Sequence, residues 1–363
     1  MGNLPAGGRN PWPNLTRKRY DTLDVAHNSM SQSNDGNVRP IISAEFKGYK
    51  WVAIGDTLYR SSKWKTFHDF LFDYIRSVLG PDWGNSELRK HPSEQHSIVQ
   101  WYISVCHLQR QHIKKEGEIY SGVCTGTAAA YLSLAYDLYI LRHHALLQNR
   151  LVERLKNNDQ FQGARYEVYV TAVLIRAGFS IDFEDEADRT TTHCEFRAAH
   201  KETRKRFSVE AKSRHRPGLL GRPGKLQSPE EIRLRIGRLL RSALAKRASD
   251  FRIVFIDINM PPEDVGLFAN IWFRPLMNEV ERVERSIISG RPAPPAYVII
   301  TNHPYHYVGN EQPDPSKNYL MTAINIPEFK QQPNGSAGPI DPTILALWDS
   351  INKHTTIPHT FEG

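Results

Sequence analysis

Apolar and polar residues alternate over short runs in the second half of the chain, which predicts β-strands. The clearest run is Phe207-Ser-Val-Glu-Ala-Lys212, in which every second residue is apolar and would face a core. Longer stretches between the runs carry apolar residues at three- and four-residue spacing, typical of helices. We predict strands over 179–184, 192–198, 206–212, 252–258 and 297–301. We predict helices over 161–177, 228–248 and 266–289, the last interrupted at Pro275.

The first half of the chain has a different pattern. Residues 1–40 are rich in Gly, Pro, Asn and Ser, which indicates an arm or a disordered lead-in. Two short strand-like runs follow, and then the helical spacing dominates. Strands are predicted over 41–45 and 51–59, and helices over 64–79, 93–115 and 127–156. After residue 301 the chain is Pro-rich, with one short helix predicted over 342–352.

From residue 158 the predicted order is α-β-β-β-α-β-α-β. Three consecutive strands favour an antiparallel meander, and strands reached through helices favour parallel pairing. We therefore expect an α/β domain with a mixed central sheet and helices on both faces. The expected division is an N-terminal arm with short β elements (1–59), a mostly α-helical module (60–157), the α/β domain (158–301) and a C-terminal extension (302–363).

Composition narrows the class of protein only slightly. The chain has 363 residues and a net charge of +8, which weakly favours an anionic partner such as nucleic acid. Its three cysteines include no C-x-x-C pair, which argues against a cysteine-based zinc site and favours a reducing, cytoplasmic compartment. The opening residues lack the apolar core of a signal peptide, and no apolar run is long enough to predict a membrane span.

Charged residues on the predicted strands are the first sign of chemistry. Glu210 and Lys212 share the polar face of their strand, about 7 Å apart along it. Glu195 has the same position on the preceding strand, so the hairpin would bring it within a few ångströms of Glu210. Glu167 lies beside the inner stripe of the helix over 161–177. The sequence therefore predicts a cluster of carboxylates and one lysine.

Such a cluster suits metal-assisted hydrolysis of a phosphodiester. Carboxylate oxygens are the ligands that Mg²⁺ prefers, and the metal activates water and stabilises charge on the phosphate. A nearby lysine can orient the water or neutralise charge on the phosphate. Two like charges on a half-buried face also favour a bound cation.

These residues, in this order of elements, resemble the PD-(D/E)XK nuclease superfamily, whose members have the restriction-endonuclease-like fold with an α-β-β-β-α-β core. The resemblance covers roughly residues 158–301 and does not extend to the helical module. It implies that Glu195 and Glu210 bind the metal, that Lys212 acts on the water, and that Glu167 is the accessory helix glutamate.

The chain departs from the family at one position. Where the family usually has Asp, often after Pro, this chain has Cys194-Glu195. The longer side chain still offers carboxylate oxygens to a metal but changes the geometry of the site. Asp182 and Glu184, on the preceding predicted strand, are alternative ligands.

Basic residues cluster directly after the strand that carries Lys212. A solvated surface is the ordinary interpretation of such charges, but acidic partners are scarce after Glu231, so we favour contacts with a phosphate backbone. His193 and Arg197 share the face of Glu195, as flanking residues or phosphate contacts. The candidate nucleic-acid-binding residues are Arg197, Arg214, Arg216, Arg222 and Lys225.

The resemblance implies a Mg²⁺-dependent nuclease in which Mn²⁺ substitutes, an endonuclease acting on DNA rather than RNA, with antiviral defence or DNA repair as candidate roles. The helical module would recognise substrate, bind a protein partner or mediate self-association. One alternative is a nuclease-like subunit that no longer cuts and binds nucleic acid or assembles a complex. Another is a protein-binding adaptor that acts through residues 60–157.

Overall fold

The structure is a computed structural model of the chain. It describes residues 16–19, 38–115, 117–183, 194–228, 233–262, 272–303, 305–313, 319–329 and 341–362. Most of the lead-in predicted over residues 1–40 lies outside this set, as do Glu184 and His193.

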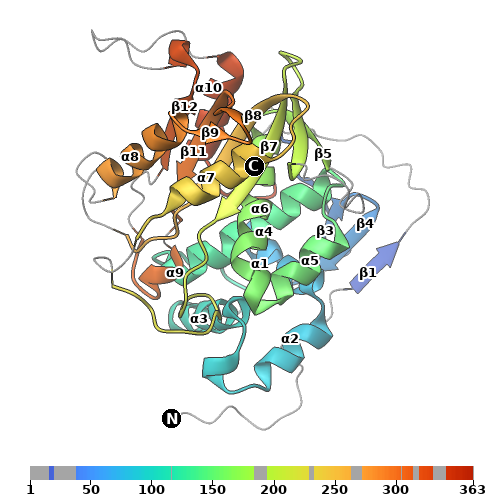
Figure 1. The fold of residues 1–363 in the computed structure, drawn as a ribbon. Helices are drawn as coiled ribbons and strands as arrows, with labels where there is room; N and C mark the ends of the chain where they lie inside the picture. Colours follow the sequence, from blue (N-terminus) through green and yellow to red (C-terminus); the bar gives the residue numbers. More distant parts are fainter. Residues whose placement is uncertain are drawn as a thin grey trace.

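A six-stranded mixed sheet forms the centre of the C-terminal half (Figure 1). The first three of its strands make the predicted antiparallel meander, and β7, β8 and β11 are parallel. The strands lie in the order β12-β11-β8-β7-β6-β5. Their bounds are β5 Phe179–Phe183, β6 Phe196–His200, β7 Arg206–Ser213, β8 Phe251–Asp257, β11 Ala296–Thr301 and β12 Tyr319–Ile324.

Helices cover both faces of this sheet, which confirms the predicted α/β class. On one face, α6 (Asn158–Arg176) and α10 (Pro342–Asn352) share a core with Val209 and Phe255. On the other face, α7 (Ile236–Ala245) and α8 (Phe273–Glu284) pack against Val254 and other strand residues. Glu210 pairs with Val254 in register, so its side chain lies on the α7 face.

The starts of α7 and α8 differ from the predictions, and both helices end before the predicted residues 248 and 289. The helix expected to start at residue 228 begins at Ile236, because residues 233–235 are not helical and Arg235 has a left-handed φ of 45°. Residues 229–232 lie outside the described set. Helix α8 begins at Phe273, so Pro275 falls in its first turn, where a helix does not need the missing N–H group. The earlier start expected at residue 266 lies outside the described residues.

A helical module precedes the sheet, as predicted. The long helix expected over 127–156 is two helices, because the chain turns at Ala145, which has a φ of 60°. The first helix of the α/β domain, α6, contributes Phe161 and Val168 to the core of the module. The helices are α1 (Phe67–Leu79), α2 (Pro81–Leu88), α3 (Ser97–His112), α4 (Gly126–His143) and α5 (Asn149–Lys156), with a 3-10 turn, η1, over Pro92–Glu94.

An antiparallel sheet in the order β1-β4-β3-β2 packs on the module. Its inner face contributes Val52, Ile54 and Tyr59 to the core of the module. Its strands are β1 (Thr16–Arg19), β2 (Ile42–Phe46), β3 (Tyr49–Ile54) and β4 (Thr57–Ser61).

The C-terminal extension returns to the helical module. The backbone N–H of Phe67 donates to the carbonyl of His359 over 2.9 Å, and the ring of Phe361 packs edge-on against Phe67. At the start of α4, a Cβ on Gly126 would lie 2.4 Å from the carbonyl oxygen of Tyr305, so only glycine permits this approach. The small elements of this region are β9 (Ile287–Ile288), β10 (Arg291–Pro292), α9 (Tyr305–Val308) and η3 (Pro327–Phe329).

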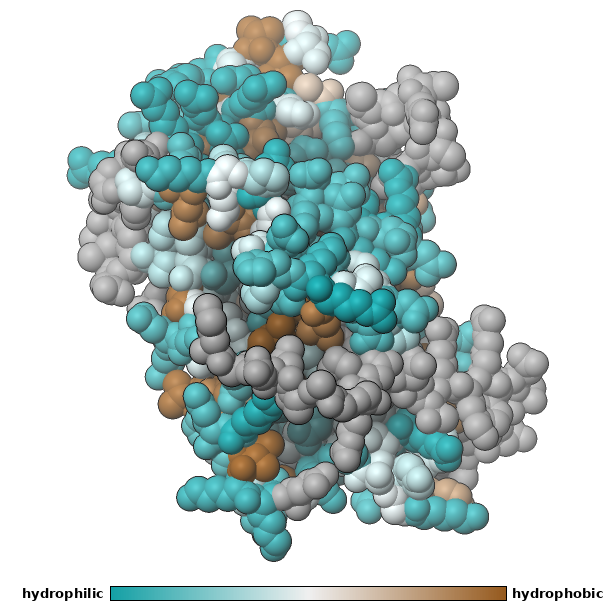
Figure 2. All heavy atoms as spheres, turned by 90° about the horizontal axis from the view of Figure 1, so that it is seen from below, coloured by the Kyte–Doolittle hydropathy of each residue, from teal (hydrophilic) through white to brown (hydrophobic). Residues whose placement is uncertain are grey.

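Among the described residues, no helix combines the length and apolar character that a bilayer crossing requires. Figure 2 views the molecule from below, from the end at which α2 and α3 lie. Hydrophilic residues make up most of the coloured part of that face, and hydrophobic residues form small separate groups there.

Candidate active site

The hairpin of β6 and β7 brings the two predicted metal ligands together. Phe196 pairs with Val209, so the next position of the antiparallel register places Glu195 opposite Glu210. Glu210 is only 1% exposed, while the side chain of Glu195 is 23% exposed. One carboxylate is therefore buried in the sheet, and its neighbour lies at the edge of solvent.

Two lysines compensate the carboxylate pair. Lys212, on the same strand, contacts Oε1 of Glu210, and its Nζ lies 3.7 Å from Oε1 of Glu195. Lys246, directly after α7, places its Nζ 2.8 Å from Oε1 of Glu210 and 3.5 Å from Oε1 of Glu195. The predicted pair of acids and one lysine is thus a cluster of two negative and two positive groups.

Burial governs the protonation of this cluster. Burial and the charge of Glu195 raise the pKa of Glu210, against the opposing effect of the two lysines. Burial alone would lower the pKa of Lys246, but the two carboxylates raise it, so this lysine stays charged. Burial raises the pKa of Cys194 to about 11, with a further contribution from Glu210. The thiol is therefore protonated near neutral pH and is neither a nucleophile nor a metal ligand in that form.

The donor set is compatible with Mg²⁺. Oε2 of Glu210 is buried and has no hydrogen-bond partner among the described residues. No group of three His, Cys, Asp or Glu in the described part of the chain is arranged to hold a metal. Mg²⁺ nevertheless commonly binds through one or two carboxylates and fills its remaining positions with water and substrate phosphate. Glu195 and Glu210 fit that pattern when the ammonium groups of Lys212 and Lys246 move away from the carboxylate oxygens that a metal would bind.

Glu167 does not join this cluster in the way that we expected. It projects from α6, which packs on the sheet face opposite to α7. Its Oε2 lies 2.6 Å from Nη1 of Arg154 in α5, and the residue is 7% exposed. We assign Glu167 to this ion pair between two helices rather than to the carboxylate pair.

Asp182 and Arg197 lie one row away from the carboxylates. They pair in register between β5 and β6, and their side chains form an exposed ion pair of 3.0 Å. Asp182 therefore pairs with Arg197, and its role as an alternative ligand stays a prediction. The other alternative ligand, Glu184, lies outside the described residues.

The basic loop after β7 is partly buried where it leaves the strand and more exposed farther along. Arg216 is only 4% exposed, and its guanidinium donates to the carbonyls of Ile258 and Asn259 over 2.9 and 3.1 Å. Nε and Nη2 of Arg216 are thus used inside the molecule, an arrangement that does not favour the predicted contact of this residue with phosphate. Arg214 is partly buried, Arg222 contacts His215 over 3.0 Å, and Lys225 is exposed.

Lys246 is the residue that the sequence pattern missed. The sequence placed it in a group of basic residues for which we favoured phosphate contacts over a solvated surface, in a helix predicted to run to residue 248. The helix ends at Ala245, and the extended backbone at Lys246 (φ −63°, ψ 149°) leaves the helical path. Its contacts with Glu195 and Glu210 depend on how α7 packs over the sheet, for which the local sequence carries no signal.

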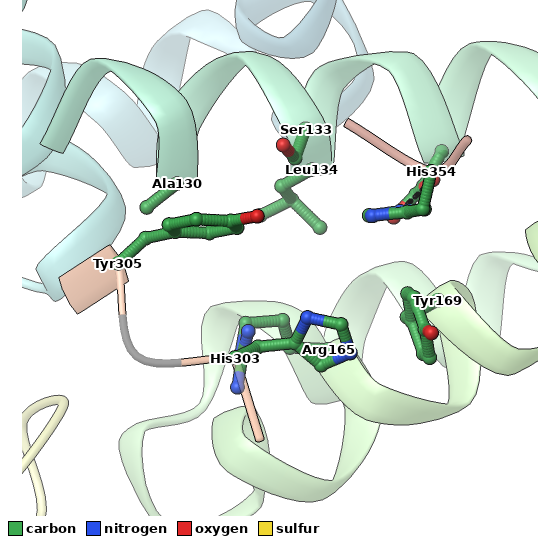
Figure 3. A pocket seen from close by; sticks show the side chains of 9 residues that line it. Ala130, Ser133, Leu134, Arg165, Tyr169, His303, Tyr305 and His354 are labelled. Atoms are coloured by element: carbon green, nitrogen blue, oxygen red, sulfur yellow. Dashed lines mark hydrogen bonds and ion pairs between the residues drawn. The ribbon is translucent and has the colours of Figure 1, made fainter. Parts of the chain in front are cut away.

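A separate cavity lies between α4, α6 and the C-terminal extension (Figure 3). Arg165 and Tyr169 point into it from α6, together with His303 and His354. Its volume of about 20 Å³ suits a water molecule rather than a nucleotide. Each of these four side chains has a buried polar atom without a hydrogen-bond partner in the described structure. The cavity shares no residue with the carboxylate pair, so we do not regard it as the active site.

Comparisons of the chain with protein-family models, with curated proteins and with solved structures found no match.

Proposed function

We propose that this chain is a metal-dependent nuclease with a restriction-endonuclease-like core. The observation that carries the proposal is the buried Glu210 opposite Glu195, with Lys212 in contact with Glu210 on the same strand. The order α6-β5-β6-β7-α7-β8 supports it, because it agrees with the order in the superfamily that the sequence resembles. Glu210 lies on β7 and Glu195 directly precedes β6, which supports the correspondence that the resemblance implies.

In this proposal Glu195 and Glu210 hold Mg²⁺, with Mn²⁺ as a substitute. When bound, the metal acts as a Lewis acid on the phosphate and lowers the pKa of a coordinated water. Burial in the sheet fixes the position of the Glu210 carboxylate. The side chain of Lys212 is 23% exposed, so its ammonium group can reach a phosphate oxygen or hold the attacking water by a hydrogen bond.

We propose DNA as the substrate and endonucleolytic cleavage as the reaction, with antiviral defence or DNA repair as the setting. The partly exposed Arg222 and the exposed Lys225 follow the strand that carries the lysine and are suited to contact phosphates. Such contacts would place the backbone near the site without selecting a base sequence. The helical module remains available for substrate recognition, a protein partner or self-association.

The proposal predicts cleavage that depends on Lys212. Plasmid, linear duplex and single-stranded DNA are incubated with the protein and Mg²⁺ or Mn²⁺, and products are resolved on gels. We expect at least one substrate to be cut, and Lys212→Ala to reduce the rate by about 100-fold or more, the size of a lost transition-state donor. Lys115→Ala is the matched control, since Lys115 is 75% exposed and pairs with Glu118 at the surface. The proposal would be contradicted if wild type cut none of the substrates, or if wild type and Lys212→Ala cut at equal rates.

A second candidate function is a nuclease-like subunit that binds nucleic acid or assembles a complex without cutting. One observation favours it: the ammonium groups of Lys212 and Lys246 already balance the two carboxylates. A site balanced in this way needs no metal for electrostatic compensation. Binding of DNA without cleavage, at equal affinity in wild type and Lys212→Ala, is the result that this alternative predicts.

Lys246 provides a test of metal binding that does not require activity. Its ammonium lies against both carboxylates, so it competes with a cation for the same oxygens. We expect Lys246→Met to bind Mn²⁺ about tenfold more tightly than wild type, or about 1.4 kcal/mol. Isothermal titration calorimetry measures the affinity, and Arg241→Met, at an exposed position of α7, is the control. An affinity of Lys246→Met equal to or below that of wild type would show that this lysine does not compete with the metal.

A further inference from the structure

The outer face of the N-terminal sheet carries exposed aromatic and apolar residues. Side chains alternate along β3, so Val52 and Ile54 are fully buried against the helical module while Tyr49 is 39% exposed. On β2, Ile42 is 49% exposed and Phe46 is 59% exposed. The buried face accounts for the attachment of the sheet to the protein, and the outer face has no such role among the described residues.

The register gathers these side chains into one surface. Phe46 pairs with Tyr49, and Trp51 pairs with Arg60 on β4, so all four side chains lie on the outer face. The surface crosses three strands. We define this set, Phe46, Tyr49, Trp51 and Arg60, as the aromatic face.

Cations are interleaved with the rings of the aromatic face. The guanidinium carbon of Arg60 lies 5.1 Å from the ring centre of Tyr49 and 5.2 Å from that of Trp51. The Nζ of Lys47 lies 5.2 Å from the ring centre of Phe46. Both arrangements are cation–π contacts, which hold the rings and leave charge at the surface.

We propose that the aromatic face binds single-stranded nucleic acid. Proteins that bind single strands combine aromatic rings, on which successive bases stack, with a basic path for the backbone. A duplex keeps its bases stacked inside, so its bases are not available to a flat sheet surface. The ligand is therefore a strand with unpaired bases, with Tyr49 and Phe46 as stacking residues and Arg60 and Lys47 as phosphate contacts.

The distribution of charge on the sheet supports this choice of ligand. The outer positions of β2, β3 and β4 carry the cation Arg60 and no acid. Glu45, the acid of β2, lies on the opposite side, where its Oε2 is 3.5 Å from Nζ of Lys50. The backbone of strand β1 pairs along the edge of β4. The aromatic face is thus complementary to a polyanion.

The same charges argue against a second copy of this chain as the occupant. In a face-to-face dimer about a two-fold axis, the cationic groups of the two copies would come together, and like charges in an interface are unfavourable. An apolar surface that served a dimer would also have few charged residues at its centre. Arg60 lies between two rings of the aromatic face. In a dimer this position would be the centre of the interface, from which water is excluded.

Fluorescence anisotropy of a labelled 20-nucleotide oligothymidine tests the inference. EDTA is present, so binding is measured without cleavage. We expect Phe46→Ala/Tyr49→Ala to weaken binding at least tenfold, since stacking of one base is worth about 1–3 kcal/mol. Arg60→Gln should weaken it as well, and a duplex of the same length should bind the wild type more weakly than the single strand. Trp348→Ala and Lys115→Gln, exposed positions elsewhere, are the controls and should bind as wild type does.

Two results would overturn the inference. One is an affinity of Phe46→Ala/Tyr49→Ala and of Arg60→Gln equal to that of wild type. The other is a wild-type dimer in sedimentation experiments that Phe46→Ala/Tyr49→Ala converts to a monomer, which would identify the aromatic face as a self-association surface. Circular dichroism verifies the folding of each variant. If the double variant is unfolded, the affinity of Arg60→Gln, which removes no ring, decides the test. The inference does not rest on the nuclease proposal, because the aromatic face shares no residue with the carboxylate pair or its lysines.

Discussion

Glu210→Gln should lower Mg²⁺-dependent cleavage by more than about 100-fold, because even the outer-shell partners of metal ligands are worth about 10- to 100-fold. The amide keeps the size of the side chain and removes the negative charge that the metal requires. It also leaves Lys212 and Lys246 with one fewer anion, so two positive groups would face Glu195 alone. The variant should therefore bind Mn²⁺ weakly as well.

The control for this variant lies on the same hairpin. Glu202 is exposed in the turn between β6 and β7, so Glu202→Gln makes the same chemical change away from the pair. Initial rates of cleavage and Mn²⁺ affinity by calorimetry are measured for both variants. Cleavage by Glu210→Gln at the rate of Glu202→Gln would exclude Glu210 as a metal ligand.

Asp257→Ala should lower the free energy of unfolding by about 3–5 kcal/mol, the usual loss when one partner of a buried ion pair is removed. Asp257 lies at the end of β8 and is completely buried. Its carboxylate lies 3.5 Å from Arg165 and accepts hydrogen bonds from Ser213 and from the backbone N–H of Asn259. Burial raises the pKa of Asp257, and Arg165 opposes that effect. The alanine variant would leave three donors without their acceptor.

Urea unfolding monitored by circular dichroism measures this loss. Asp349→Ala is the matched control, because Asp349 forms an exposed ion pair with Lys353 on α10. Exposed pairs contribute about 0–1 kcal/mol, so the control should be close to wild type. Equal unfolding midpoints for the two variants would mean that the Asp257 network does not stabilise the fold.

The strands could be predicted because their signal is local. Alternation of period two marked β5 and β7, and short apolar runs marked β8 and β11, each to within one or two residues. Strand β12 was missed, since its Pro-rich surroundings suggested an irregular tail and its pairing with β11 is a tertiary contact. The break between α4 and α5 was missed for a related reason. The apolar spacing continues across it, and only the left-handed backbone of Ala145 ends the helix.

The same distinction applies to the candidate site. Glu195 and Glu210 could be placed together because a short hairpin sets its own register. The partners of Glu167, Arg216 and Lys246 come from elements distant in sequence or packed across the sheet. An arginine that donates to buried carbonyls has the same sequence pattern as an arginine that contacts phosphate. Distinguishing the two requires the fold.

The most direct test of the metal site is a crystal soaked in Mn²⁺, with data collected at a wavelength where manganese scatters anomalously. We predict an anomalous peak between Glu195 and Glu210, within about 2.3 Å of an oxygen of each carboxylate, with the ammonium group of Lys246 displaced from Glu210. Density that shows both lysines still against the carboxylates at saturating Mn²⁺, without a peak between them, would contradict the proposed metal site.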